Sequence, residues 1–255
     1  MDLNGKIALV TGGGTGIGKA VSEAIAKKGV RVAIASRNPS HLRSAADDLA
    51  AASLLPVEMD VTKKDQVQKG IAKIIERWGP IDILVNNAGI SGLNRIDDAD
   101  DSRWRAIVET NLTGTYLVTK EVLRSMKNHA HGRIINVSSV LGKFGVPGYT
   151  AYCATKHGLI GFTRALALEV VGRGITVNAI CPGWVETEMA RQGIEESAAN
   201  EAITPEAFKK RAIEAVPIKR FLDAGEVAGL VLYLVSEKAA GITGQAINIC
   251  GGQTM

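Results

Sequence analysis

Short apolar runs alternate with longer amphipathic stretches along the chain. The apolar runs are rich in Val, Ile and Leu, as expected for strands that are buried on both faces of a sheet; they are Lys6–Thr11, Arg31–Ser36, Pro56–Asp60, Ile81–Asn86, Arg133–Ser138, Ile175–Ile180 and Gln245–Ile249. The amphipathic stretches have helical periodicity; they are Ile17–Lys28, Ser40–Ala52, Lys63–Trp78, Ser102–Lys127, Ala151–Val171 and Gly225–Leu234. This alternation predicts right-handed βαβ crossovers. We therefore expect an α/β fold with a doubly wound sheet of seven mainly parallel strands and helices on both faces.

One region interrupts the alternation. The strands that end at Ile180 and begin at Gln245 are separated by a long excursion, and its first half, Trp184–Lys219, is polar and punctuated by proline. Excursions of this size are usually functional. No Pro/Ser-rich linker or repeat divides the chain, so we expect one domain over residues 1–255 with a small lid at about 184–219.

Composition and charge exclude several functional classes. The hydrophobic fraction of 46% and the charged fraction of 22% are those of an ordinary globular protein. The net charge of +4 is small and dispersed, so we expect no nucleic-acid partner. No apolar run reaches membrane-spanning length, and the N-terminus lacks the apolar stretch of a signal peptide. We expect a cytoplasmic protein with no membrane association.

The cysteines and histidines give no sign of a disulfide or a metal site. Cys153, Cys181 and Cys250 form no close pair, and the four histidines have no metal-binding spacing with them. Reduced thiols in a cytosolic protein are the ordinary interpretation of such a pattern. We therefore expect no metal cofactor.

A glycine-rich turn directly follows the first predicted strand. The sequence runs Thr11-Gly12-Gly13-Gly14-Thr15-Gly16-Ile17-Gly18 before the first helical stretch. Glycines permit a tight turn, and the missing side chains let the backbone approach a pyrophosphate at a helix N-terminus. The spacing is T-G-x-x-x-G-x-G, and its position between a strand and a helix predicts a nucleotide-binding site.

The end of the second predicted strand indicates which nucleotide binds. A protein that selects NAD places Asp or Glu there to hold the ribose 2′-hydroxyl, whereas this chain has Ser36-Arg37-Asn38. A carboxylate would repel a 2′-phosphate, and a guanidinium can bind it through paired hydrogen bonds. The alternative is that Arg37 is only a solvated turn residue. We expect NADP(H), with Ser36 and Arg37 at the phosphate.

Several motifs occur in an order that resembles the short-chain dehydrogenases/reductases over essentially the whole chain. They are the glycine turn, Asp60-Val61, Asn86-Asn87-Ala88-Gly89, Asn111, Ser139, Tyr152-Cys153-Ala154-Thr155-Lys156 and Pro182-Gly183-Trp184-Val185-Glu186-Thr187. The resemblance implies a Rossmann-like fold. Within the family, the chain is most similar to 3-oxoacyl-thioester (acyl-carrier-protein) reductases and aromatic-polyketide ketoreductases. Segments that carry this similarity include Glu109–Gly114, Lys156–Thr163 and Asn248–Gly252.

The resemblance also implies the cofactor-binding residues. The glycine turn would wrap the pyrophosphate and the adjoining ribose through Gly12, Gly14, Thr15, Gly16, Ile17 and Gly18. Asp60 and Val61 would frame the adenine. The motif Asn87, Ala88 and Gly89 would line the cofactor cleft, and the segment with Pro182, Gly183, Val185 and Thr187 would hold the nicotinamide carboxamide.

The same resemblance implies a catalytic tetrad of Asn111, Ser139, Tyr152 and Lys156. Tyr152 and Lys156 are spaced i, i+4 and so project from one helix face. A nearby ammonium stabilises a phenolate, so we expect Lys156 to lower the pKa of Tyr152 and to hydrogen-bond the nicotinamide ribose. Ser139 would hydrogen-bond the substrate oxygen, and Asn111 would interrupt its helix and hold a water that relays protons to Lys156. Ser138 is the competing serine, and only the family spacing selects Ser139.

These residues predict reduction of a carbonyl by NADPH, with Tyr152 as proton donor. The leading substrate is a 3-oxoacyl thioester or a polyketide-like ketone. The alternatives are a secondary-alcohol or hydroxysteroid-type dehydrogenase working oxidatively, and a non-enzymatic dinucleotide-sensing or scaffold protein. Family resemblance also implies a homotetramer and, in acyl-carrier-protein reductases, basic residues beside the cleft; Arg173 matches one such position, whereas Ala130 stands at the other.

The lid and two loops would surround the substrate. Apolar candidates in the lid are Met189, Ile194, Phe208 and Val216. The loops Ser91–Ile96 and Val140–Tyr149 would form the opposite walls.

Overall fold

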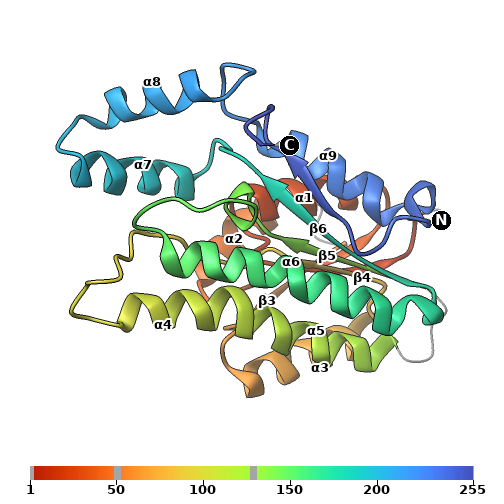
Figure 1. Cartoon of the computed structure of the whole chain (residues 1–255). Helices are drawn as coiled ribbons and strands as arrows, with labels where there is room; N and C mark the ends of the chain where they lie inside the picture. Colours follow the sequence, from red (N-terminus) through yellow and green to blue (C-terminus); the bar gives the residue numbers. More distant parts are fainter. Residues whose placement is uncertain (1–2, 49–52, 127–130, 255) are drawn as a thin grey trace.

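A sheet of seven parallel strands forms the centre of the molecule (Figure 1). The computed structural model describes residues 3–48, 53–126 and 131–254. The strands are β1 (Ile7–Thr11), β2 (Arg31–Ser36), β3 (Leu54–Glu58), β4 (Ile83–Asn86), β5 (Gly132–Val137), β6 (Ile175–Pro182) and β7 (Ala246–Ile249). Their order is β3-β2-β1-β4-β5-β6-β7, so the chain reverses direction across the sheet between β1 and β4. In open sheets of this kind a ligand binds outside the carboxyl ends of the strands at the reversal.

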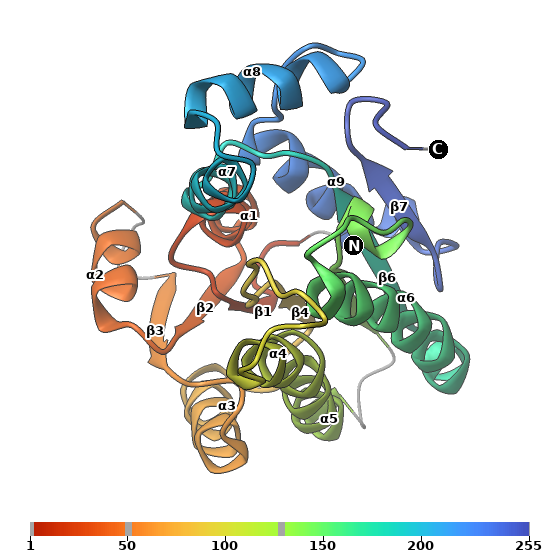
Figure 2. The same cartoon turned by 60° about the vertical axis from the view of Figure 1, so that its left-hand side comes forward.

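Helices cover both faces of the sheet, as the sequence predicts (Figure 2). One face packs against α1 (Gly16–Ala26), α2 (Pro39–Asp48) and α9 (Ala224–Val235), and the other against α3 (Lys64–Trp78), α5 (Gly114–Ser125) and α6 (Thr150–Val170). Side chains of β1 alternate between the two cores, because successive residues of a strand point to opposite faces: Val10 joins the first core and Leu9 the second.

Most predicted elements begin and end within two residues of the observed bounds, and the starts of the third strand and the second helix are examples. The third strand begins at Leu54 instead of Pro56, because Leu54 and Leu55 pair in register with Val32 and Ala33 of β2. The second helix begins at Pro39, and the predicted end near Ala52 lies outside the described residues.

The predicted helix Ser102–Lys127 is divided into three segments. An α-helix, α4 (Ser102–Val108), leads into one turn of π-helix, η1 (Glu109–Thr113), which continues as α5. Single π turns inside helices occur frequently at functional sites. Asn111 lies in this turn, so the predicted local interruption is confirmed, and the predicted end at Lys127 lies outside the described residues.

The lid consists of two helices that the apolar pattern does not reveal. These are α7 (Glu188–Asn200) and α8 (Pro205–Ala215), which pack on each other beyond the carboxyl ends of the strands (Figure 1). Thr187 and Thr204 cap their N-termini, accepting hydrogen bonds from the backbone N–H of Ala190 and Ala207. Caps of this kind satisfy backbone donors that a helix start leaves open.

Candidate active site

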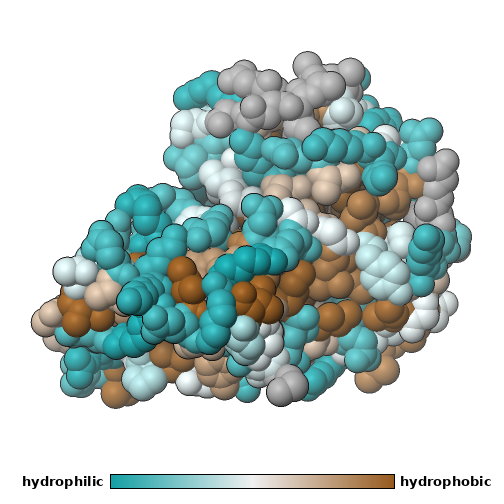
Figure 3. All heavy atoms as spheres, turned by 90° about the horizontal axis from the view of Figure 1, so that it is seen from above, coloured by the Kyte–Doolittle hydropathy of each residue, from teal (hydrophilic) through white to brown (hydrophobic). Residues whose placement is uncertain are grey.

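A cleft of about 390 Å³ opens at the carboxyl ends of the strands, between the glycine turn and the lid. Its wall is drawn from distant parts of the chain. It includes Gly12, Thr15–Ile17, Asn87–Gly89, Ser91, Leu93, Val137–Leu141, Phe144, Val146, Pro147, Tyr149, Tyr152, Lys156, Pro182–Val185, Thr187–Ala190, Gly193, Ser197, Asn200, Glu201, Phe208 and Gln253. On the α8 side of the molecule, apolar side chains gather among hydrophilic ones (Figure 3).

The glycine turn has no room for a side chain at Gly12, Gly13, Gly14 or Gly18. Gly12 has a φ of +63°, and a Cβ there would lie 2.9 Å from Nδ2 of Asn87. A Cβ on Gly18 would lie 2.2 Å from the carbonyl oxygen of Gly12. Asn87 closes the turn from behind, because its Nδ2 donates to the carbonyls of Thr11 and Gly12 at 3.0 and 3.2 Å. The turn is therefore a fixed backbone cradle at the start of α1.

The predicted cofactor residues divide into two groups. Gly12, Thr15, Gly16, Ile17, Asn87, Ala88 and Gly89 line the cleft together with Pro182, Gly183, Val185 and Thr187. Gly14 and Gly18 are buried beneath the turn. Ser36, Arg37, Asp60 and Val61 are not among the lining residues. Arg37 is exposed after β2, and no hydrogen bond or ion pair engages its guanidinium within the described part of the chain.

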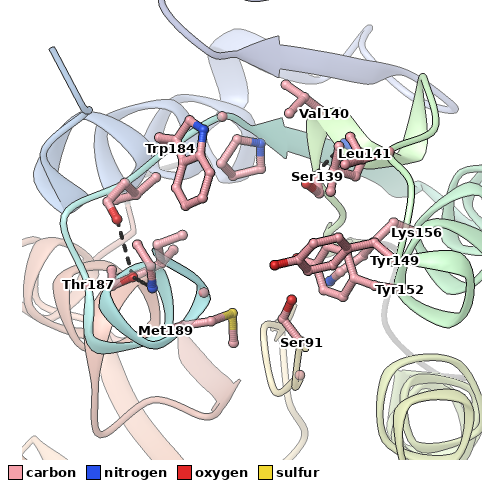
Figure 4. A pocket seen from close by; sticks show the side chains of 18 of the residues that line it. Ser91, Ser139, Val140, Leu141, Tyr149, Tyr152, Lys156, Trp184, Thr187 and Met189 are labelled. Atoms are coloured by element: carbon pink, nitrogen blue, oxygen red, sulfur yellow. Dashed lines mark hydrogen bonds between the residues drawn. The ribbon is translucent and has the colours of Figure 1, made fainter. Parts of the chain in front are cut away.

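Tyr152 and Lys156 project from α6 into the same side of the cleft (Figure 4). The ammonium of Lys156 donates to the carbonyl of Val137 at 2.8 Å and lies over the Tyr152 ring, 5.4 Å from its centroid. Burial raises the pKa of Tyr152 to about 12, although a hydrogen bond with Ser139 acts to lower it. Burial also lowers the pKa of Lys156 to about 8.

The prediction of a lowered pKa for Tyr152 is therefore wrong, because burial raises that pKa to about 12. The spacing correctly brings the two side chains together, but the ammonium faces the ring and the Val137 carbonyl. Loss of water around the phenol disfavours its charged form and outweighs the opposing hydrogen bond. The phenol is consequently protonated throughout the neutral range.

The structure distinguishes the two competing serines. Ser138 is buried, and its hydroxyl donates to the carbonyl of Lys156 at 2.9 Å, so it holds the α6 backbone against the end of β5. The Ser139 oxygen accepts from the backbone N–H of Leu141 at 3.1 Å and hydrogen-bonds Tyr152. Ser139 thus presents its hydroxyl beside the phenol in the cleft (Figure 4), whereas Ser138 is occupied structurally.

Asn111 lies behind the cleft and is not one of its lining residues. Its Oδ1 accepts from the N–H of Ile90 at 2.8 Å, and its Nδ2 donates to the Ile90 carbonyl and to Oγ1 of Thr155. The side chain is almost fully buried. Asn111 therefore ties the chain after β4 to α6, one residue before Lys156, and the predicted proton-relaying water stays a prediction.

The segment after β6 forms the wall between the turn and the lid. Val185 makes a parallel bridge with Leu222, and Trp184 accepts a backbone hydrogen bond from Leu222 at 2.8 Å. The Thr187 hydroxyl donates to the Val185 carbonyl at 3.2 Å while capping α7 (Figure 4). Trp184 stacks on Phe221 at 5.2 Å and packs edge-on against Phe208 at 6.4 Å.

Sequence reasoning missed two features of the cleft, although the predicted loop Val140–Tyr149 and the predicted lid include Tyr149 and Ser197. Tyr149 and Ser197 join their hydroxyls at 2.9 Å across the gap between α6 and the lid. Gln253, near the C-terminus, reaches the cleft with a buried Oε1 that has no hydrogen-bond partner among the described residues. The position of Tyr149 three residues before Tyr152 is a local signal, but the contact with Ser197 joins residues 48 positions apart.

The expected substrate loops and two of the four predicted lid residues do line the cleft. Leu93 and Phe144 belong to the two predicted loops, and Met189 and Phe208 to the lid. Ile194 and Val216 are buried and face other surroundings, so their prediction as substrate contacts is wrong. Ile194 lines a second hollow with Pro205 and Lys209, and Val216 lies beside Gly251.

The described residues contain neither a cluster of metal-binding side chains nor a helix that could span a membrane. Within residues 3–48, 53–126 and 131–254, no three His, Cys, Asp or Glu side chains come close enough to hold a metal ion. In the same ranges, no helix combines the length and apolar character that crossing a membrane requires.

Comparison with known proteins gives consistent matches. Residues 6–198 match the family model described as short chain dehydrogenase. A putative ketoacyl reductase of Streptomyces coelicolor is 43% identical over 252 residues, which are 97% of this chain and 96% of that protein. The 3-oxoacyl-(acyl-carrier-protein) reductase of Escherichia coli (strain K12) is 39% identical over 255 residues, 100% of both.

Solved structures agree with the sequence matches. A variant of actinorhodin polyketide ketoreductase with NADPH has a TM-score of 0.94 and 42% identity, and the match covers 97% of each chain. Levodione reductase has a TM-score of 0.93 and 30% identity, with 98% of each chain covered.

Proposed function

The chain belongs to the short-chain dehydrogenase family, and on that premise we propose that it reduces a ketone to a secondary alcohol with NADPH, with Tyr152 as the proton donor. The observation that carries this proposal is the pairing of Ser139 and Tyr152 in one cleft with the glycine turn. A hydrogen-bonded hydroxyl pair can hold a carbonyl oxygen and protonate it. The relatives named as ketoacyl reductases support the same reaction.

The cleft fits a dinucleotide. The turn lines the cleft with bare backbone at Gly12 and Gly16, and a Cβ on Gly12 would lie 2.9 Å from Nδ2 of Asn87. Such a bare turn at the N-terminus of α1 suits a pyrophosphate, and the unengaged guanidinium of Arg37 suits a 2′-phosphate. The turn, Asn87 and the segment Pro182–Thr187 would hold the cofactor, which supplies the hydride.

The chain's own residues supply the proton and the charge stabilisation. Tyr152 is protonated at neutral pH and donates its proton to the carbonyl oxygen, and Ser139 donates a hydrogen bond to the same oxygen. Lys156 lies over the ring and stabilises the phenolate left behind. Asn111 is a positioning residue, because its amide links Ile90 to Thr155 beside Lys156.

The substrate is a small-molecule ketone. The finer proposal is a 3-oxoacyl thioester or a polyketide-like ketone, supported by the names of the relatives in Streptomyces coelicolor and Escherichia coli. Arg173, half-buried after α6, is the one predicted basic residue in the described part of the chain, since Ala130 lies outside it. A homotetramer, like the cytoplasmic location, rests on family resemblance.

The test is a panel of ketones and acyl thioesters, each assayed with NADPH and with NADH. We expect turnover of ketones with a clear preference for NADPH. Tight NADPH binding without turnover of any carbonyl would instead favour a dinucleotide sensor. The reverse assay, secondary alcohols with NADP⁺, separates a reductase from an oxidative dehydrogenase by comparing kcat/KM in the two directions at neutral pH.

A further inference from the structure

Two hydroxyls form an isolated polar spot in the cleft. The Tyr149 and Ser197 oxygens lie 2.9 Å apart, and both residues line the cleft. Tyr149 directly precedes α6, and Ser197 comes from the lid helix α7. Tyr149 and Tyr152 project from the same wall toward the opposite side of the pocket (Figure 4).

Within the part of the chain that the structure describes, this pair has hydrogen-bonding capacity that no other protein group uses. Each hydroxyl has one O–H donor and two acceptor lone pairs, and their mutual bond consumes one donor and one acceptor. One O–H is left over. Burial raises the pKa of Tyr149, so the phenol keeps its proton at neutral pH and the spare donor persists.

The surroundings of the pair are largely apolar. Leu93, Phe144, Val146, Met189 and Phe208 line the same cleft. In apolar pockets, a few placed polar groups fix the orientation of a ligand. A spare donor there would hydrogen-bond an oxygen of the substrate that is not the one being reduced, since Ser139 and Tyr152 hold that one.

We propose that Tyr149 and Ser197 form a second oxygen-binding site, which selects ketones that carry another carbonyl or hydroxyl oxygen a few bonds from the reduced carbonyl. The proposal rests on the function proposed above. The short spacing follows from the chain, because Tyr149 is three residues before Tyr152 on the same wall. A simple monoketone would leave the spare donor without its partner.

A purely structural role for the pair makes a different prediction. The pair also joins the lid to the cleft wall, beside a second link in which Glu196 of α7 accepts from the Leu93 N–H at 3.1 Å and from Arg103 at 2.9 Å. Arg103 is not a lining residue. Loss of the lid attachment would therefore follow from either Tyr149→Phe or Arg103→Met, and it would affect every ketone alike.

The experiment compares two matched ketones, 2,2-dimethylcyclohexane-1,3-dione, which cannot enolise between its carbonyls, and 2,2-dimethylcyclohexanone. Wild type, Tyr149→Phe, Ser197→Ala and Arg103→Met are assayed with saturating NADPH. We expect Tyr149→Phe to lower kcat/KM for the diketone about ten-fold, as for loss of one hydrogen bond, and for the monoketone less than about two-fold. Ser197→Ala should shift the same ratio in the same direction, and Arg103→Met should leave the ratio unchanged.

The outcomes separate the second oxygen site from the overall reaction. The second oxygen site would be overturned if Tyr149→Phe left the ratio of kcat/KM for the diketone to that for the monoketone unchanged. It would also be overturned if Arg103→Met showed the same selective loss for the diketone. If wild type reduces neither ketone nor any member of the wider panel, the proposed function itself fails. Should Tyr149→Phe not fold, as judged by its melting temperature and NADPH binding, Ser197→Ala decides the question.

Discussion

The glycine turn and the lid lie on opposite sides of one cleft, and their surroundings restrict their residues to very different degrees. In the turn, steric exclusion dictates the residues: a Cβ on Gly18 would lie 2.2 Å from a backbone oxygen. In the lid, α7 and α8 are largely exposed and are linked by surface ion pairs such as Arg211–Glu201. Gly193 of α7 lines the same cleft, yet no atom of the described residues lies within 4 Å of a Cβ placed there.

The rigid turn suits a ligand that does not vary, the dinucleotide. The exposed lid suits a ligand that can vary, the substrate. Backbone groups that cradle a phosphate have no freedom, because hydrogen bonds from neighbours such as Asn87 fix the position of the backbone. Exposed ion pairs contribute only about 0–1 kcal/mol each, so the lid can accept new side chains without loss of the fold. The nucleotide-binding part, formed by the glycine turn and Asn87, is therefore rigid. Side chains of the lid can change, and such changes would alter which substrate binds.

The largest expected effect comes from Gly18→Ala. The added methyl group meets the Gly12 carbonyl, which can move only if the whole turn moves. We expect the free energy of unfolding to fall by about 1–3 kcal/mol and NADPH affinity to fall about 100-fold or more, as measured by denaturant unfolding and fluorescence titration. Unchanged NADPH affinity would contradict the rigidity assigned to the turn.

Arg37→Ala tests the selectivity for NADPH over NADH. Loss of a charge-assisted contact with the 2′-phosphate should weaken NADPH binding by about 1.5–3 kcal/mol, or roughly 10–100-fold. NADH affinity should stay the same, and so should stability, because the side chain is exposed. Lys64→Ala, another exposed cation, is the matched control. An equal loss for both nucleotides would show that Arg37 does not contact the phosphate.

The pH dependence of ketone reduction tests Tyr152 and Lys156, which line the same cleft as the glycine turn and the lid. The lowered pKa of Lys156, about 8, means that the ammonium is charged below this pH and neutral above it. Tyr152, with a pKa raised to about 12, remains a proton donor throughout. Reduction should therefore fall by up to about ten-fold per pH unit above about 8. In Lys156→Arg the guanidinium keeps its charge above pH 8, so any remaining activity should show no inflection near that pH. If the inflection persists, a group other than Lys156 causes it.

The smallest effect is expected for the same substitution made in the lid. Gly193→Ala meets no neighbour within 4 Å and replaces glycine in a helix by the best helix former. Stability should rise by about 0.5–1 kcal/mol, and NADPH affinity should not change. Thermal unfolding and titration measure both quantities. A loss of stability or of NADPH binding would remove the contrast between the two halves.

The sequence predicts best what a rigid physical constraint enforces. The seven strands follow from continuous apolar runs, because both faces of a parallel sheet are covered. The glycine turn follows from residues that nothing else can replace. The lid helices escaped prediction because exposed helices have weak apolar patterns, and their clearest signals, the caps Thr187 and Thr204, are short and local.

Contacts between segments that are distant in the sequence could not be predicted from it either. The Tyr149–Ser197 hydrogen bond spans 48 positions, and no local pattern encodes it. The pKa of Tyr152 depends on how completely the folded chain removes water from the phenol, so the i, i+4 spacing predicted the proximity of Lys156 but gave the wrong direction of the shift.

In the proposed reaction Tyr152 protonates the ketone while the glycine turn holds NADPH, and a single-turnover experiment on Tyr152→Phe tests this role most directly. Enzyme, NADPH and diketone are mixed, and NADPH oxidation is followed by absorbance. Removing a general acid typically slows the chemical step about 10²–10⁴-fold, and we predict a loss in this range with NADPH affinity nearly unchanged. Turnover at the wild-type rate would contradict the account.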